Sequence, residues 1–240
     1  MFSVIILKNI PALTKDEYDC LFPFISLEKQ ERIKQFHFEG DAHNCLLGDI
    51  LIRSEICRLT GMSNKQLEFS VNMYGKPFLI DNSQIHFNIS HAGCYVACVL
   101  SSEPVGIDIE IIKPIELKIA EQFFTSDEMA YVMDENHICR FYEVWTKKES
   151  RIKKEGKGLS KSLTSFSVFE LIIQEPPLIY HKVFRNEEAI CHVCSTKQAL
   201  PLISVINTSM FIQSISPTLF PSHASNPSYS ANVHFEHKNL

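Results

Sequence analysis

One stretch of this chain reads Val105-Gly106-Ile107-Asp108-Ile109-Glu110, and a second reads Trp145-Thr146-Lys147-Lys148-Glu149-Ser150-Arg151-Ile152-Lys153. The first alternates aliphatic and acidic side chains and predicts a strand, in which residues two apart point to the same face. The second predicts a helix in which Glu149 and Lys153 stand one turn apart. A divalent cation and a phosphate group need several acids and a lysine close together, so the two stretches indicate phosphoryl-group chemistry.

The composition indicates a globular chain with a sizeable core. Its 240 residues are 45% hydrophobic and include 17 Phe, enough for one large domain or two small ones. The formal net charge of −5 argues against a dedicated nucleic-acid binder, which usually carries a basic surplus. No apolar stretch approaches the roughly 20 residues that a membrane span needs. The residues before Lys8 lack the basic leader of a secretory signal, and we therefore expect a cytoplasmic protein.

The eight cysteines are expected to be reduced thiols, because disulfides are rare in the cytoplasm. Cys191-His192-Val193-Cys194 has the spacing of a redox or zinc pair. The run around it is typical of a strand, in which residues three apart face opposite sides. The pattern therefore disfavours a paired role for Cys191 and Cys194.

The periodicity of the first half predicts both helices and strands. A capping box of Thr14 and Glu17 begins one helix, and Asp41 is expected to cap a long helix that Gly61 ends. The expected helices are 14–20, 26–36 and 41–59, and the expected strands are 3–10, 67–71, 85–89, 95–100 and 105–111.

The second half repeats this order in outline. Helices at 116–123 and 127–133 lead to a helix at about 139–155, and strands are expected at 165–173, 181–185 and 189–195. This echo predicts an α+β protein of two similar lobes, residues 1–104 and 105–200. Residues 201–240 form a C-terminal extension, which is expected to be disordered from about Ser216 because its composition turns to Ser, Pro, Asn and His.

The three acids admit both a structural and a functional interpretation. Asp108 and Glu110 could line the solvated side of an edge strand. Glu149 stands on an apolar stripe of its helix, so it points to the interior or to a cleft, where Lys153 could neutralise it in a simple salt bridge. The alternative is that all three hold Mg²⁺, which prefers oxygen ligands. Glu128 is a fourth acid, for which the capping box with Thr125 favours a structural role.

Basic and polar residues that could face these acids are spread over the first half. Phe87-Asn88-Ile89-Ser90-His91 ends a strand, and the Ala92-Gly93 that follows indicates a tight turn where backbone can approach a ligand. Lys76 lies in a Gly-Lys-Pro turn, and Lys29 and Arg32 lie one turn apart on a helix. Each alone is typical of solvated surface, and His91 alone is typical of a core, but together they would suit a phosphate-rich ligand.

These motifs in combination resemble the Sfp-type 4'-phosphopantetheinyl transferase family over about residues 1–195. The resemblance is carried by six segments: Tyr74-Gly75-Lys76-Pro77, Phe87-Asn88-Ile89-Ser90-His91, Gly106-Ile107-Asp108-Ile109-Glu110, the Trp145–Lys153 stretch with Glu155-Gly156-Lys157-Gly158-Leu159 after it, Asp41-Ala42-His43, and Leu46-Leu47-Gly48-Asp49. The family implies a monomer of two α+β lobes related by a pseudo-twofold axis, with coenzyme A in a cleft between them.

The resemblance also implies an activity and a set of site residues. Members move the 4'-phosphopantetheine arm of coenzyme A onto a serine of an apo peptidyl or acyl carrier protein, as in non-ribosomal peptide antibiotic biosynthesis, and release 3',5'-ADP. Asp108, Glu110 and Glu149 would hold Mg²⁺. The residues that would contact coenzyme A are Lys29, Arg32, Lys76, Pro77, Ser90, His91, Lys148 and Lys153. Glu149 would act as the base, Lys153 would stabilise the departing phosphate, and His91 would face the 3'-phosphate.

Two departures from the family pattern keep other interpretations open. Asn44 stands where the family carries a basic residue, and Cys45 stands near a hydroxyl position. One alternative is therefore a binding module for coenzyme A or a carrier protein that has lost turnover. A second is a metal-dependent nuclease or phosphodiesterase, because Asp108 with Glu155-Gly156-Lys157 loosely matches a nuclease signature; that signature needs its Glu and Lys on a strand, and here they end a predicted helix.

Overall fold

The computed structural model describes residues 1–9, 12–170 and 176–219. The α-helices are α1 (Lys15–Leu21), α2 (Leu27–Ile33), α3 (Glu39–Thr60), α4 (Lys118–Phe123), α5 (Ser126–Met133), α6 (His137–Glu155) and α7 (Thr208–Leu219). The strands are β1 (Phe2–Lys8), β2 (Phe69–Val71), β3 (Pro77–Leu79), β4 (His86–Ala92), β5 (Tyr95–Ser101), β6 (Gly106–Ile111), β7 (Ile179–Arg185), β8 (Ala189–Ser195) and β9 (Leu202–Asn207).

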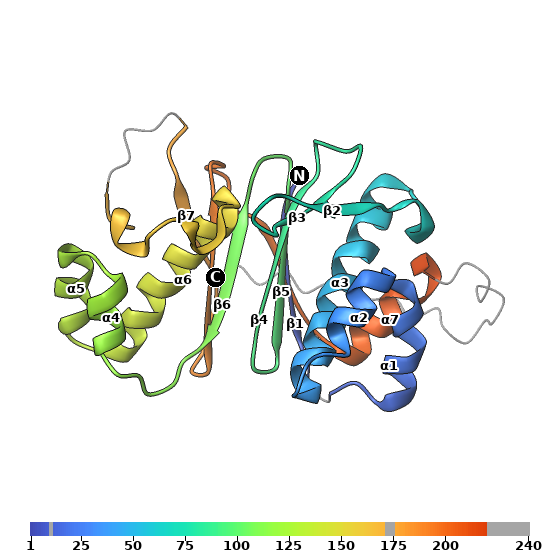
Figure 1. The fold of residues 1–240 in the computed structure, drawn as a ribbon, viewed down its shortest axis with the longest axis horizontal. Coiled ribbons are helices and arrows are strands. Elements are labelled where there is room, and N and C mark those ends of the chain that lie inside the picture. Colours follow the sequence, from blue (N-terminus) through green and yellow to red (C-terminus); the bar gives the residue numbers. More distant parts are fainter. Residues whose placement is uncertain (10–11, 171–175, 220–240) are drawn as a thin grey trace.

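Two sheets lie back to back in the middle of the molecule, with helices on the outside of each (Figure 1). The N-terminal lobe holds a sheet of order β4-β5-β1-β9, and the C-terminal lobe holds a sheet of order β6-β8-β7. The long helix α3 packs on the first sheet and the long helix α6 packs on the second. The expected α+β fold of two lobes is therefore confirmed.

The sequence of β1 follows from its place between two cores. Ile5 and Leu7 pack against the helices of the N-terminal lobe, whereas Val4 and Ile6 pack against the other sheet. A strand buried on both faces needs an unbroken apolar run rather than an alternating one. Strand β6 is different, since Ile107 and Ile109 fill the core between the sheets, while Asp108 between them faces α6 and pairs with Lys153.

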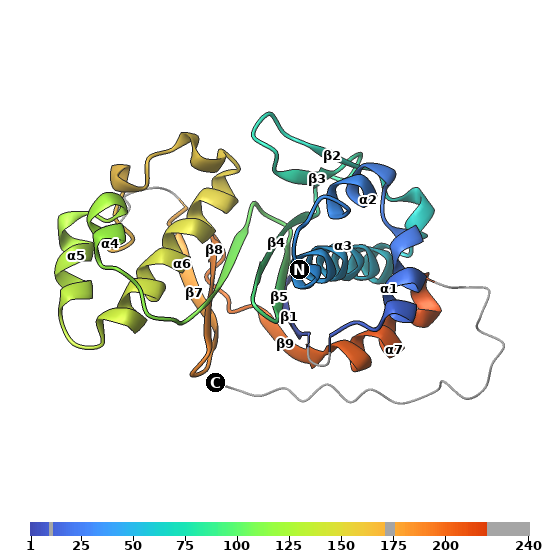
Figure 2. The same ribbon diagram turned by 60° about the horizontal axis from the view of Figure 1, so that its bottom comes forward.

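Strand β6 lies beside β4, where the two lobes meet (Figure 2). Side chains of β4 make the connection, because Asn88 Oδ1 accepts a hydrogen bond from Ile107 N at 2.9 Å and Ser90 Oγ accepts one from Ile109 N at 3.3 Å. Polar side chains at the end of the N-terminal sheet thus fix the strand that carries Asp108 and Glu110.

The chain returns to the N-terminal lobe after residue 201. Strand β9 pairs in parallel with β1, and α7 adds Phe211 and Ile215 to the core around α3. The segment that the sequence marked as an extension therefore contributes a strand and a helix to the first lobe. The disorder predicted from about Ser216 falls mostly outside the described residues, because α7 runs to Leu219 and 220–240 are not described.

Two local predictions are wrong. Asp41 does not cap α3: the helix begins at Glu39 with Phe38 as its N-cap, and Asp41 lies inside the first turn. The strand expected at 165–173 is not formed between residues 165 and 170, where a 3-10 turn ends at Ser165 and irregular backbone follows. The rest of that expected strand, 171–173, lies outside the described residues.

Two further expectations concerned the state of the cysteines and the presence of a membrane-spanning helix. All eight cysteines are free, and Cys191 and Cys194 stand on opposite faces of β8, Cys191 packing in the core between the sheets. Within the described part of the chain, no helix combines the length and the apolar character that crossing a membrane requires.

Candidate active site

Strand β6 and helix α6 bring the three predicted carboxylates to one place. Asp108 and Glu110 lie on the face of β6 opposite Ile107 and Ile109, and that face is covered by α6, which carries Glu149. Burial, and next the charge of Asp108, raises the pKa of both Glu110 and Glu149. The three acids therefore lie close enough to repel one another.

Lys153 joins the two lobes at this point. Its Nζ lies 2.6 Å from Asp108 Oδ1 and 2.9 Å from Ser90 Oγ of β4. Ser90 Oγ itself donates to Asp108 Oδ1 at 3.1 Å. The side chain of Lys153 is 28% exposed, whereas that of Asp108 is 4% exposed, so the ammonium caps a buried acid. The partner of Lys153 is thus Asp108 rather than Glu149, which the sequence had offered as the partner in a simple helix salt bridge.

The electrostatics of the cluster favour a bound cation. Burial raises the pKa of Glu110 to about 7, and Asp108 and Glu149 add to that shift while Lys153 and Trp145 oppose it. Burial also raises the pKa of Asp108 against the opposing charge of Lys153. Burial alone would lower the pKa of Lys153, but Asp108, Glu149 and Glu110 together raise it. One ammonium therefore faces three carboxyl groups, so the cluster contains more acidic groups than basic ones.

Magnesium fits the residues present. Asp108 Oδ2 is buried and has no hydrogen-bond partner, a costly state that a ligand would relieve. Asp108, Glu110 and Glu149 offer only oxygen donors, the kind that Mg²⁺ prefers. Over the residues that the structure describes, no three acidic, His or Cys side chains are gathered at the spacing of a preformed metal site. The fit thus rests on the donor chemistry and on the unpartnered oxygen.

Basic groups from the N-terminal lobe lie near this cluster. Burial lowers the pKa of the His91 imidazole; the charges of Lys153, Lys29 and Arg32 lower it further, and Asp41 opposes them. Lys29 and Arg32 also oppose the effect of burial, which raises the pKa of the Cys45 thiol. The charges of Lys29, Arg32 and Lys153 therefore all act on His91, and Lys153 connects this group of side chains to the carboxylates.

Lys148 is not part of this group of side chains, and the expectation that it contacts a nucleotide is wrong. Its side chain is fully buried on another face of α6, where Nζ lies 2.7 Å from Glu128, which is equally buried. The same ammonium donates to the carbonyls of Leu163 and Phe166, each at 2.7 Å. The structural role favoured for Glu128 is confirmed, since it forms the capping box with Thr125 and pairs with Lys148.

Lys76 and Pro77 also lie apart from the carboxylates. Pro77 begins β3, and Lys76 Nζ donates to the backbone carbonyls of Val105 at 3.0 Å and Lys154 at 3.2 Å. The ammonium of Lys76 therefore binds the junction of the lobes and not the acidic cluster.

The two residues that depart from the family pattern are buried in the fold. Asn44 Nδ2 donates to the carbonyl of Gly93 at 2.6 Å, and Asn44 Oδ1 accepts from Asn9 at 3.2 Å. Asn44 thus holds the turn between β4 and β5, close to His91. Cys45 is 7% exposed and packs in the core of the same lobe.

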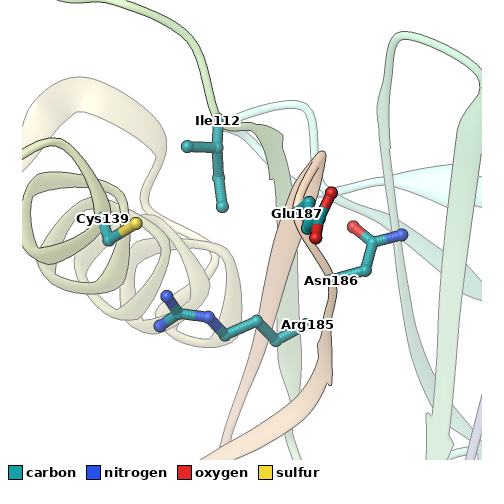
Figure 3. A pocket seen from close by; sticks show the side chains of 5 residues that line it. All are labelled: Ile112, Cys139, Arg185, Asn186 and Glu187. Atoms are coloured by element: carbon teal, nitrogen blue, oxygen red, sulfur yellow. The ribbon is translucent and has the colours of Figure 1, made fainter.

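A hollow of about 600 Å³ opens in the C-terminal lobe (Figure 3). Its lining consists of Ile112, Cys139, Arg185, Asn186 and Glu187, which come from the end of β6, the start of α6 and the β7–β8 turn. None of the predicted site residues lines it.

Sequence reasoning gave no role to two polar residues at the lobe boundary, Asn88 and Asn72, or to Trp145 of α6. Asn88 and Trp145 stood in the quoted motifs without a role; Asn88 Oδ1 accepts a hydrogen bond from β6, and Trp145 opposes the rise in the pKa of Glu110. Asn72 caps the end of α6 through the carbonyl of Gly156. Its only sequence signal was its place at the start of a Gly-Lys-Pro turn, where Asn commonly binds its own backbone.

The fold and the site define a two-lobed α+β protein in which acids of one lobe meet basic and hydroxyl groups of the other. A family model described as 4'-phosphopantetheinyl transferase, N-terminal, matches residues 12–104, and the 4'-phosphopantetheinyl transferase superfamily model matches residues 104–203.

Relatives agree with these matches. The chain is 48% identical over 160 residues to the 4'-phosphopantetheinyl transferase Sfp of Bacillus subtilis (strain 168). This match covers 65% of this chain and 71% of that protein. It is 34% identical over 218 residues to the 4'-phosphopantetheinyl transferase gsp of Aneurinibacillus migulanus. This match covers 85% of this chain and 90% of that protein. The chain therefore belongs to the 4'-phosphopantetheinyl transferase superfamily and is an enzyme of that class.

Proposed function

We propose that this enzyme takes the 4'-phosphopantetheine arm from coenzyme A, attaches it to a serine of an apo carrier protein and releases 3',5'-ADP. The observation that carries the proposal is the contact of Lys153 with both Asp108 and Ser90 at the boundary of the lobes. Acidic side chains that could bind a cation lie beside a basic side chain that could bind phosphate, and a pyrophosphate ester needs both kinds of group to bind.

Lys29, Arg32 and His91 are the groups proposed to bind the phosphates of coenzyme A. The proposal is supported by the charges of Lys29, Arg32 and Lys153, which all act on the pKa of His91. Burial and three nearby cations lower the pKa of His91 although Asp41 opposes them, and a ring N–H of His91 would donate one hydrogen bond to the 3'-phosphate. An anionic ligand would offset the repulsion among these groups.

Asp108, Glu110 and Glu149 are proposed to hold Mg²⁺. Magnesium would supply a positive charge that offsets the charge developing on the pyrophosphate. Asp108 has a second proposed part, because its Oδ1 fixes Lys153 and Ser90 while its Oδ2 is free for the cation.

The proposed reaction is an in-line displacement at the β-phosphorus. The serine Oγ of the carrier forms a bond to that phosphorus, and the bond from the phosphorus to the bridging oxygen breaks, so that 3',5'-ADP leaves with the electron pair. Glu149 accepts the proton of the serine, and its raised pKa suits a general base at neutral pH. Lys153 donates to the oxygens of the departing phosphate.

The proposed acceptor is a peptidyl or acyl carrier domain, since the sequence resembles transferases that activate such domains in non-ribosomal peptide synthesis. Carrier domains present an acidic surface, which would meet the positive region of Lys29 and Arg32. We propose that the enzyme acts as a monomer in the cytoplasm, where coenzyme A is found.

The release of 3',5'-ADP tests this function. The purified enzyme would be mixed with coenzyme A, Mg²⁺ and an apo peptidyl carrier protein, and the nucleotide products would be separated by chromatography. We expect 3',5'-ADP to form in step with modified carrier and to disappear when EDTA is added. Turnover that continues in EDTA would contradict the magnesium assignment, and cleavage of added DNA would favour the nuclease alternative.

A further inference from the structure

The turn between β2 and β3 binds the C-terminal end of α6, although the two belong to different lobes. Lys76 Nζ donates to the carbonyl of Lys154 at 3.2 Å, and Asn72 Nδ2 donates to the carbonyl of Gly156 at 2.8 Å. Carbonyls in the last turn of a helix have no partner within the helix, and the negative end of the helix dipole favours a cation. The hairpin of one lobe therefore caps a helix of the other.

The turn is preorganised for this contact. Asn72 Oδ1 accepts hydrogen bonds from the backbone N–H groups of Tyr74 and Lys76, each at 2.9 Å, and Asn72 N donates to the carbonyl of Lys76 at 2.9 Å. These bonds fix the backbone on which the Lys76 side chain stands. Lys76 also donates to the carbonyl of Val105, the residue before β6, so one ammonium connects the hairpin, β6 and α6.

Two glycines allow these segments to approach closely. A Cβ on Gly106 would lie 2.0 Å from the carbonyl oxygen of Ser150 and 2.3 Å from the backbone nitrogen of Lys154. Gly156 has a φ of 66° at the end of α6, and a Cβ there would lie 3.0 Å from Lys76 Cδ. Since neither glycine can gain a side chain without movement of backbone or of Lys76, the relative position of β6, α6 and the hairpin is tightly constrained.

We propose that Lys76 is a positioning residue that, together with Asn72, holds the last turn of α6 so that Lys153 meets Asp108 and Ser90. Lys153 directly precedes Lys154, whose carbonyl Lys76 binds, so a shift of that turn would move the Lys153 ammonium away from the other lobe. This assignment rests on the proposed role of Lys153, and the contact with coenzyme A that the resemblance implied for Lys76 stays a prediction.

Amide hydrogen exchange of the free enzyme tests the structural step without coenzyme A or metal. Lys76→Met keeps the length of the side chain and removes the donor, Lys76→Arg keeps a donor, and Lys65→Met is the control because Lys65 is exposed on the same lobe. We expect exchange in residues 152–156 to become about 10-fold faster in Lys76→Met, to return toward the wild-type rate in Lys76→Arg and to stay unchanged in Lys65→Met. Unchanged exchange in Lys76→Met would overturn the proposal.

Steady-state kinetics with two donors separate positioning from ligand contact. Coenzyme A and its analogue without the 3'-phosphate would be compared for the wild type, Lys76→Met and Asn72→Ala, the last being a milder change if Lys76→Met folds poorly. We expect kcat to fall by the same factor with both donors, roughly 10-fold or more, with little change in KM. A rise in KM for coenzyme A alone would overturn positioning and make Lys76 a phosphate ligand.

A separate variant keeps the two proposals distinguishable. If Lys153→Met retained full turnover, the proposed function of Lys153 would fail, whereas the exchange rates of residues 152–156 would still report whether Lys76 holds α6. If Lys153→Met is inactive and Lys76→Met shows neither faster exchange nor lower kcat, the positioning role alone is overturned.

Discussion

Lys153 of α6 and Asp108 of β6 form an ion pair with Nζ and Oδ1 2.6 Å apart, and Ser90 of the other lobe binds both. The pair leaves the second oxygen of Asp108 buried and without a partner. A structural salt bridge would use both oxygens where it could, because an unpaired buried oxygen costs stability. The geometry thus supports a role for the second oxygen of Asp108 in binding a cation.

Asp108→Asn tests the importance of this carboxylate. We expect kcat to fall by about 100-fold or more, because the variant loses a charge at the reacting phosphates. The midpoint of thermal unfolding should change little, since Glu149 and Glu110 still face Lys153 and the repulsion among the acids is reduced. Activity and unfolding would be measured beside Asp16→Asn, an exposed control. Wild-type turnover in Asp108→Asn would refute the assignment.

Glu149→Gln tests the proposed base. We expect a loss in kcat of about 100-fold with a much smaller change in the Kd of coenzyme A, because a general base acts on the serine and not on the bound donor. Kinetics and calorimetric titration would be compared with Glu121→Gln, an exposed acid on α4. Equal losses in rate and affinity would show that Glu149 is a binding residue.

Lys148→Met tests whether Lys148 is a buried structural residue rather than a contact of coenzyme A. Removing one member of a fully buried ion pair leaves Glu128 charged and unpaired, so urea unfolding should show a loss of about 3–5 kcal/mol. Lys148→Met combined with Glu128→Gln should recover part of that loss. Wild-type stability together with weaker binding of coenzyme A would return Lys148 to the nucleotide site.

The pH dependence of stability tests the burial of Lys76. Burial, and next the charge of Lys154, lowers the pKa of Lys76 from 10.5 to about 8, while Cys194 opposes the shift; on the β4 side, His86 faces the same ammonium. Between pH 8 and pH 10.5, Lys76 keeps its proton in the unfolded chain but has lost it in the folded chain. The free energy of unfolding therefore rises with pH in this range.

The matched variant for this measurement is Lys76→Arg, because a guanidinium does not titrate in this range. Relative to Lys76→Arg, the free energy of unfolding of the wild type should rise by about 2–3 kcal/mol from pH 8 to pH 10.5. Parallel curves for the two proteins would show that the ammonium of Lys76 is solvated.

The sequence predicted the elements of the site better than its contacts. Asp108 and Glu110 were placed on one face of a strand because β6 alternates with a period of two, and the structure agrees. The C-terminal ends of the long helices were predicted well because Gly61 and Gly156 end them in the left-handed conformation. Both signals depend only on residues that are neighbours in the sequence, so they can be recognised in a single sequence.

The errors arose where distant segments meet. Lys148 and Lys153 are five residues apart, which turns them to different faces of α6, and this helical spacing could have separated them from sequence alone. No local signal showed that β9 would pair with β1, from the other end of the chain, or that Asn72 would cap α6. Both contacts depend on how the two lobes pack.

The intact mass of a carrier protein tests the central claim most directly. The enzyme would be incubated with coenzyme A, Mg²⁺ and an apo peptidyl carrier protein, and the carrier would then be weighed by mass spectrometry. The account predicts a gain of one phosphopantetheine that is absent with EDTA and with Asp108→Asn. No gain on several carriers, while coenzyme A still binds, would contradict it and indicate a binding module without turnover.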